Sequence, residues 1–466
     1  MLSDDILYLS ITELAKLLKA RKISPVELTE SYLQRLERYG ERLGAVAEVM
    51  RESALTEARA AESEIKRGRY RGVLHGVPYG AKDLLATTNA KTTWGATPYR
   101  NQQFDYDATV VKKLRAAGAI LAAKLAMVEL AGGMGYNEAG ASWTGAGRTP
   151  WNTDFWSGGS SSGPGAAVAA WLVPFAIGSE TSGSILTPAA FCGVSGLRPT
   201  YGAVSRHGAM ALSWTLDKIG PMCRSAEDCR IVLRAIAGRD TLDASSRDFP
   251  KRKADKRAKN QKLRVGVLKD SFEKTQPEVR DNFLRSIQVL KGFSDVKMDV
   301  ALPDFPYGAA VGTIVDAEGA SAFRDLIESG KVQELASPSG RTGGYAASLV
   351  TAVDYLHAMR LRAPMRRAWT EMFKNIDLLI APTRSTVAYP VAKTFDKAYP
   401  GIGGASPIGA SNLVGVPAIS IPNGFGQNNL PTGIQFIGAA WNDDLILDTA
   451  VRVQQTTDWH KKRPSL

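Results

Sequence analysis

The chain's first candidates for chemistry are serines in two turns of residues 158–184, GGSSSGPGAAVAAWLVPFAIGSETSGS. The first turn holds the serines at 160–162 and precedes an alanine-rich run. These serines therefore lie at the N-terminus of a predicted helix, where unpaired N–H groups favour negative charge. The second turn, residues 181–184, offers backbone N–H groups beside small side chains, which suits an oxyanion hole. The two turns indicate two halves of one site for attack on a carbonyl group.

A serine hydroxyl becomes a useful nucleophile only when a base removes its proton. No histidine is placed for this role, but a lysine can serve where burial lowers the pKa of its amine. Lys82 is suited to the role because it follows an apolar segment, residues 77–79, and lies among glycine and small residues. A lysine at a strand end is more often solvated, so this pattern alone does not select Lys82.

Two other serine- and glycine-rich sites compete with this interpretation. A phosphate-binding loop is excluded because residues 158–163 lack the required Gly-Lys-Ser/Thr. A nucleophile elbow stays open, since Ser161 fits G-x-S-x-G and a later histidine, His357 or His460, could complete a Ser-His-Asp hydrolase. An elbow needs a strand immediately before it, however, and residues 149–156 are polar and turn-like.

Short apolar runs alternate with capped helices along the chain, which is typical of an α/β fold with a layered sheet. A capping box at 24–27 begins an amphipathic helix, and charged helical sequence continues to about residue 69. Asp107 is predicted to cap a helix that Gly118 ends. Strands are predicted at 77–79, 119–125, 265–268, 377–383 and within 410–438. Residues 270–375 are predicted to be mostly helical, and 445–453 a closing helix.

The net charge of +12 at pH 7 is concentrated in residues 251–264, KRKADKRAKNQKLR. A short basic run between folded segments is usually solvated. We therefore interpret about 248–264 as a basic surface linker within a single domain that spans 1–466. The rest of the chain carries a modest positive excess, so nucleic acid is not an expected partner.

Composition also bears on location and on metal binding. No apolar run approaches the roughly 18–20 residues that span a bilayer. The N-terminus has acids where a signal peptide has lysines, so we expect a cytoplasmic protein. Three cysteines and four histidines show no ligand spacing. Neither a disulfide framework nor a catalytic metal is expected.

Residues 74–226 resemble the amidase signature family, whose enzymes cleave amides with a Ser–Ser–Lys triad. The family's GGSSSG motif stands at 158–163, and its nucleophile motif GSI, with a following proline, stands at 183–188. GVPYGAKD at 76–83 looks like the family's lysine motif, and FCGVSGLRPTYG at 191–202 looks like the segment after its nucleophile. Weaker similarity covers nearly the whole chain.

The resemblance implies roles for the residues at these positions. Ser184 is the implied nucleophile and Lys82 the implied base, acting through Ser160, whose preceding peptide bond the family holds in the cis form. Ser161 is implied to support this network by hydrogen bonding. The implied oxyanion hole consists of the backbone N–H groups of Thr181, Ser182, Gly183 and Ser184. Water then hydrolyses the acyl-enzyme, so we expect a hydrolase of linear amide C–N bonds that needs no cofactor.

The sequence departs from the family pattern beside the nucleophile. Ser182 stands where the family usually has glycine, and Leu186 stands where it usually has arginine. The loss of the arginine weakens any transfer of the substrate class. A small-molecule amide pocket is predicted near residues 406–412 and at Gly133, Met134, Gly135 and Tyr136. The apolar residues of these segments indicate an aliphatic or aromatic acyl group.

The family fold is one large α/β domain with a twisted mixed β-sheet flanked by α-helices. One alternative function is the glutaminase (A) subunit of a tRNA-dependent amidotransferase, which this chain also resembles. Such a subunit works in a complex that passes ammonia to aminoacyl-tRNA, but residues 335–365 lack the arginine- and glycine-rich segment expected of it. A catalytically inactive scaffold is disfavoured because all three triad positions are filled. A homo-oligomer is compatible with the sequence.

Overall fold

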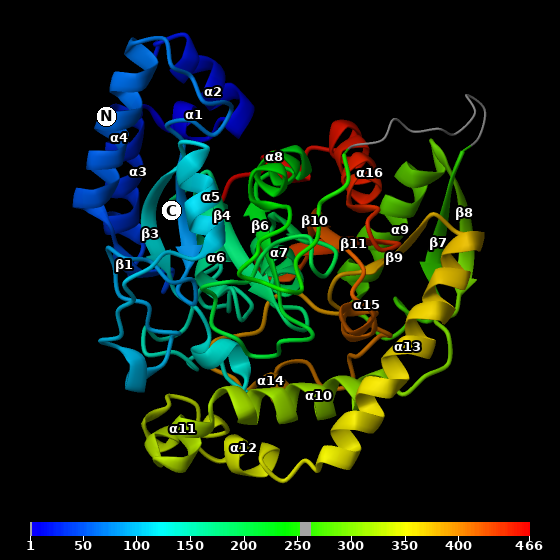
Figure 1. Cartoon of the computed structure of the whole chain (residues 1–466). Coiled ribbons are helices and arrows are strands. Elements are labelled where there is room, and N and C mark those ends of the chain that lie inside the picture. The colour runs from blue at the N-terminus through cyan, green and yellow to red at the C-terminus, as the bar shows by residue number, and fades with distance from the viewer. Residues whose placement is uncertain (1, 252–261) are drawn as a thin grey trace.

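The computed structural model describes residues 2–251 and 262–466 (Figure 1). The predicted basic linker lies partly outside the described residues, at 252–261. In the described part of the chain, one mixed sheet of eleven strands has the order β1-β3-β2-β4-β6-β5-β10-β11-β9-β7-β8. Its strands are β1 Val46–Val49, β2 Pro78–Lys82, β3 Ile120–Leu125, β4 Phe175–Glu180, β5 Ser195–Arg198, β6 Lys218–Cys223, β7 Leu263–Leu268, β8 Ser294–Val300, β9 Leu378–Pro382, β10 Ala418–Phe425 and β11 Pro431–Gly438.

Helices flank this sheet, and the predicted α/β fold with a large mixed sheet is confirmed. In Figure 1, α10, α11 and α12 lie along the lower edge of the view, and α13 rises from there along the right-hand side. The helices are α1 Asp4–Leu7, α2 Ile11–Lys19, α3 Pro25–Tyr39, α4 Arg51–Lys66, α5 Thr109–Ala116, α6 Ser162–Ala169, α7 Leu186–Cys192, α8 Ala226–Ile236, α9 Pro277–Lys291, α10 Tyr307–Ala322, α11 Arg324–Glu328, α12 Gly340–Ala347, α13 Ala352–Asn375, α14 Phe395–Ala398, α15 Ile408–Val414 and α16 Asp443–Thr456.

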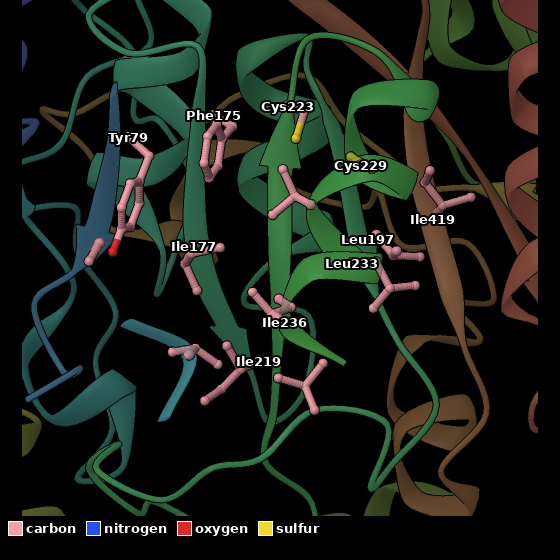
Figure 2. Close-up of a cluster of buried hydrophobic side chains, with 14 of the residues drawn as sticks. Tyr79, Phe175, Ile177, Leu197, Ile219, Cys223, Cys229, Leu233, Ile236 and Ile419 are labelled. Carbon is pink, nitrogen blue, oxygen red and sulfur yellow. The ribbon is translucent and has the colours of Figure 1, made fainter. Parts of the chain in front are cut away.

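Alternate residues of the central strand β4 join different apolar clusters. Phe175 and Ile177 pack with residues of α8, whereas Ala176 packs with residues of α6. Successive side chains of a strand point to opposite faces, so the sheet is buried on both sides here. Figure 2 shows Tyr79 of β2 beside Phe175 of β4, and their rings stack with centroids 5.2 Å apart. The strands that end at the candidate site are therefore held rigidly from both faces.

The capping box at the start of α3 is confirmed. The Ser24 hydroxyl accepts the Glu27 N–H, and the Glu27 carboxylate accepts the Ser24 N–H, both at 3.0 Å. The prediction of helical sequence to about residue 69 is wrong, because β1 separates α3 from α4. This strand has only four residues, and it forms by pairing antiparallel to β3, which no local pattern reveals.

Two further predictions need correction. Asp107 does not cap α5; Ala108 is the N-cap residue, and the Asp107 carboxylate instead pairs with Arg115 and accepts the Thr88 N–H. The charge-assisted bond from the Arg115 guanidinium is stronger than a bond from the backbone N–H groups of α5, so the carboxylate does not cap the helix. The mostly helical stretch 270–375 also contains the edge strand β8, which is largely solvent-exposed. Val296, Met298 and Val300 alternate with charged residues there, a strand signal that the helical prediction did not take into account.

Across the described ranges, no helix is both long enough and apolar enough to cross a membrane.

Candidate active site

Lys82 and Ser160 meet where β2 ends. The Nζ atom of Lys82 donates hydrogen bonds to the hydroxyls of Ser160 and Ser179, at 2.8 and 2.9 Å. Burial lowers the pKa of Lys82 to about 7, against the opposing effect of the carboxylates of Asp217 and Glu180. A lysine with this pKa exists partly as the free amine at neutral pH and can accept a proton.

The register of the sheet explains this contact. β2 and β4 are parallel neighbours, with Gly80 opposite Ala176 and Ala81 opposite Ile177. Parallel strands end at the same edge of a sheet, so Lys82 ends β2 beside the end of β4. Apolar sequence on both strands thus places a lysine in a buried position where its charge is costly.

The two serine turns lie against each other. The N–H of Ser161 donates to the carbonyl of Ser184 at 3.2 Å. The Ser161 hydroxyl donates to the carbonyl of Ser179 at 3.1 Å and accepts the Ser179 N–H at 3.3 Å. The Gly159–Ser160 peptide bond is cis. The structure therefore brings Ser160, Ser161 and Ser184 into one site, in which Ser160 and Ser161 are buried and Ser184 is partly exposed.

The turn after β4 presents unpaired backbone donors. Between residues 2 and 251 and from 262 onward, no hydrogen-bond acceptor faces the N–H groups of Ser182, Gly183 and Ser184. The Ser182 side chain is exposed, so it does not fill the inside of the turn. The hydroxyl of Thr181 donates to the Asp217 carboxylate at 2.6 Å. Successive free N–H groups can bind an oxygen on which negative charge develops.

Glu180 holds the backbone that follows this turn. Its Oε2 atom accepts the N–H groups of Ile185 and Leu186 at 2.8 and 2.9 Å, and its Oε1 atom accepts bonds from Arg198 and Asn412 at 2.9 and 2.7 Å. Burial raises the pKa of Glu180, but Arg198 and these donors outweigh it and keep the pKa below its ordinary value. The side chain is therefore an anion at neutral pH.

Leu186, one of the two departures from the family pattern, is fully buried in an apolar cluster that includes Ile408 and Leu413. Arg198 of β5 provides the positive charge beside Glu180. A buried ion pair is favourable only when its remaining donors and acceptors are satisfied. Arg198 also donates to the hydroxyl of Ser411 and the carbonyl of Val416, each at 3.0 Å.

Sequence reasoning did not find Ser179 or Arg198 as site residues, and it placed Asn412 in the predicted pocket segment 406–412 without its bond to Glu180. Ser179 could have been found, since strand alternation puts it two residues after buried Ile177 and close to the implied triad. Arg198 lies in a motif noted from the sequence. Its contact with Glu180 could not be predicted, because the folded sheet is what brings β5 and the end of β4 together. Asn412 lies 232 residues from Glu180 along the chain, and no local pattern joins them.

A cavity of about 180 Å³, called the site cavity below, opens beside this network and is lined by Ser179, Thr181, Asp217 and residues between 206 and 214. The predicted pocket loop contacts its wall. A Cβ atom placed on Gly133 would lie 2.4 Å from the side chain of Leu212, which lines the cavity, and Ala131, just before the predicted loop, is itself a lining residue.

The remaining pocket predictions fall in two places. Met134 is buried, and Gly135 is exposed beside it. The Tyr136 ring packs edge-on against Trp156, with centroids 6.1 Å apart. The segment 406–412 reaches the turn itself, because a Cβ atom on Gly183 would lie 3.2 Å from the Ile408 side chain. That these residues contact the substrate stays a prediction.

The surroundings of Ser161 do not match a nucleophile elbow. Residues 149–156 form turns with isolated bridges, and in the described ranges no strand immediately precedes Ser161. His357 is exposed on α13, and among the described residues no histidine is hydrogen-bonded to the Ser161 hydroxyl. Nor do three or more His, Cys, Asp or Glu side chains gather, in residues 2–251 and 262–466, where they could hold a metal ion.

A family model described as Amidase matches residues 27–447, which include every residue of the network above. The chain belongs to this family. The resemblance inferred from the serine and lysine motifs is therefore confirmed, as is the prediction that the protein is an enzyme that hydrolyses amides.

Relatives of this amidase cover nearly its full length. The putative amidase AmiD of Mycobacterium bovis is 38% identical, over 99% of this chain and 97% of its own. The glutamyl-tRNA(Gln) amidotransferase of Acinetobacter baumannii has an A subunit that is 36% identical, over 99% of both chains. Among solved structures, the peptide amidase of Stenotrophomonas maltophilia matches with a TM-score of 0.85 and 30% identity, over 98% of both chains.

Proposed function

We propose that this amidase hydrolyses a carboxylic amide through a serine acyl-enzyme, with Lys82, Ser160 and Ser184 as its catalytic triad. The observation that carries the proposal is the buried contact of 2.8 Å between Lys82 Nζ and Ser160 Oγ. Burial lowers the pKa of Lys82 to about 7, which supplies a base at physiological pH.

In the proposed acylation step, Ser184 Oγ forms a bond to the amide carbonyl carbon while its proton passes through Ser160 to Lys82. Collapse of the tetrahedral intermediate breaks the C–N bond. The proton returns through Ser160 to the leaving nitrogen, so the amine or ammonia departs neutral. A water molecule then attacks the ester by the same proton route, which releases the carboxylic acid and restores Ser184.

The turn at 181–184 supports the oxyanion role. The free N–H groups of Ser182, Gly183 and Ser184 face no protein acceptor in the described structure, and a fourth donor is proposed at Thr181. Glu180 fixes the next two backbone N–H groups, so the turn is held before substrate arrives. Preorganised donors of this kind contribute about 10²–10³-fold each to the rate of acyl transfer.

The direct test is a panel of primary amides, glutamine included, assayed with the wild-type enzyme and with Ser184→Ala and Lys82→Ala. We expect both variants to lose at least about 10³-fold in kcat while remaining folded. A serine-directed fluorophosphonate should label the wild-type chain and not Ser184→Ala. Wild-type rates in both variants would rule out the proposed triad.

A second function is favoured by one observation. The similarity to the A subunit of the amidotransferase covers 99% of both chains at 36% identity, close to the similarity to AmiD. By that analogy the site would release ammonia from glutamine as one component of a complex that acts on aminoacyl-tRNA. The buried Leu186, where the family usually has arginine, does not support this alternative.

The purified chain decides between the two functions. An independent amidase hydrolyses simple amides without partner subunits. A glutaminase subunit is inactive alone, prefers glutamine, and gains activity only when partner subunits and tRNA are added. Equal rates with and without such partners would support the first proposal.

A further inference from the structure

A second cavity adjoins the site cavity. The two share the lining residues Ala209, Met210, Ala211 and Trp214, which lie on one short segment between β5 and β6. The second cavity has a volume of about 310 Å³ and is called the aromatic cavity below. This one segment therefore forms part of the wall of both cavities.

The aromatic cavity is lined by rings. Its wall contains Trp94, Phe104, Tyr106, Trp214 and Phe323, and the other lining residues are glycine, alanine and methionine. The site cavity differs, because charged side chains such as Arg206, Asp217 and Asp243 line it. An amide group can be held by the charged side chains of the site cavity, whereas the rings of the aromatic cavity offer faces and edges to another aromatic ring.

The rings of the aromatic cavity form a connected surface. The centroid of Trp94 lies 6.3 Å from that of Phe104 and 6.4 Å from that of Phe323, and Phe104 lies 5.5 Å from Tyr106. Offset and edge-on pairs at these distances are the arrangements that aromatic groups prefer. A further ring can join the cluster by the same contacts.

Two of these rings stay open to solvent. Trp214 is 46% exposed and Tyr106 is 38% exposed, although large apolar side chains gain free energy from burial. The backbone of Trp214 is nevertheless held, since its carbonyl accepts hydrogen bonds from the Tyr201 hydroxyl and the Arg206 guanidinium. An exposed indole on a fixed backbone is a preformed contact surface.

We propose that the amide substrate carries an aromatic ring, that this ring occupies the aromatic cavity, and that Trp214 selects for it; the inference rests on the proposed amide hydrolysis at Ser184. A cavity of about 150 Å³ is enough to bind benzene, so the observed volume accommodates one ring and a short linker. Propionamide, which has no ring, reaches the site without using this compartment.

The test compares three amides that differ only in the ring. Propionamide has none, 3-phenylpropionamide carries it on the acyl side, and propionanilide carries it on the nitrogen. We expect one ring-bearing amide to exceed propionamide by at least about tenfold in kcat/KM, and the better of the two shows which side of the scissile bond faces the aromatic cavity. Equal values for all three would overturn the proposal.

The decisive variant is Trp214→Ala, which should remove most of the preference for the ring, measured as the ratio of kcat/KM for the better ring-bearing amide to kcat/KM for propionamide. Tyr345→Ala is the matched control, because Tyr345 is also 46% exposed but lies on α12 and lines neither cavity. If Trp214→Ala does not fold, Tyr106→Ala tests the same surface. An unchanged preference in the folded variant would contradict the assignment.

A binding measurement separates this inference from the proposed function. Calorimetry on Ser184→Ala, with and without Trp214→Ala, measures the affinity for 3-phenylpropionamide, propionanilide and propionamide without turnover. Tighter binding of a ring-bearing amide that depends on Trp214 supports the aromatic cavity even if the wild-type enzyme hydrolyses none of the three. Binding of both ring-bearing amides that is no tighter than that of propionamide, or too weak to detect, overturns it.

Discussion

Arg198 and Glu180 form an ion pair in which Nη1 lies 2.9 Å from Oε1 and neither side chain is exposed to solvent. Glu180 in turn accepts the N–H groups of Ile185 and Leu186. The pair thus connects β5 to the backbone that follows the proposed nucleophile.

Removing the cation of this pair should destabilise the fold strongly. Arg198→Leu leaves a buried carboxylate without its partner, and we expect the free energy of unfolding to fall by about 3–5 kcal/mol. Urea denaturation measures this change. The double variant Glu180→Gln/Arg198→Leu, which has no buried charge at this position, should be more stable than Arg198→Leu alone. A double variant that is less stable than the single one would contradict this account.

The same carboxylate should make stability depend on pH. The pKa of Glu180 is lower in the folded chain than in the unfolded chain, so its ionised form contributes stability that is fully present above the unfolded value of about 4.3. The contribution disappears as the pH falls through the lower folded pKa. We expect the difference in Tm between the wild-type enzyme and Glu180→Gln to shrink below about pH 4.3. A Tm difference that stays constant from pH 7 to pH 3 would show that the ionised form of Glu180 does not stabilise the fold.

Activity should follow the free amine of Lys82. Because burial lowers the pKa of Lys82 to about 7, the neutral form grows as the pH rises, and kcat/KM should increase through pH 7 and then level off. The Lys82→Arg variant keeps the positive charge, but its guanidinium cannot deprotonate. We therefore expect its kcat/KM to be at least about 10³-fold lower than that of the wild-type enzyme and not to increase through pH 7. Wild-type activity that declines between pH 6 and pH 8 would be inconsistent with this role.

Ser179 is predicted to position the lysine. Its hydroxyl accepts a bond from Lys82 at 2.9 Å, and one such hydrogen bond contributes about 1 kcal/mol. Ser179→Ala should therefore lower kcat by about five- to tenfold, far less than Lys82→Arg. Ser63→Ala, at an exposed position on α4, serves as the control, and its kcat should equal that of the wild-type enzyme. A loss as large as that of Lys82→Arg would mean that Ser179 is itself in the proton path.

Local patterns predicted the elements that carry their own signals. The capping box of α3 and the continuous apolar run of β9 are visible in a few adjacent residues. β1 was missed because it is a four-residue edge strand that exists through pairing, whereas β8 does carry a local signal, the alternation of Val296, Met298 and Val300 with charged residues. Asp107 was misassigned because Arg115, near the C-terminal end of α5, takes its carboxylate. In β1 and at Asp107, a contact with another part of the chain determines the local structure, and the adjacent residues alone do not reveal that contact.

The sequence by itself determined the family, the α/β class and the proposed triad, since the motifs around Lys82, Ser160 and Ser184 are long and stand in order. Only the tertiary structure decided that Lys82 is buried and has a pKa of about 7, because desolvation depends on the whole surrounding sheet. The Glu180–Arg198 pair and the aromatic cavity likewise join residues far apart in the chain. The sheet brings these residues into contact, and that contact is a property of the packed fold.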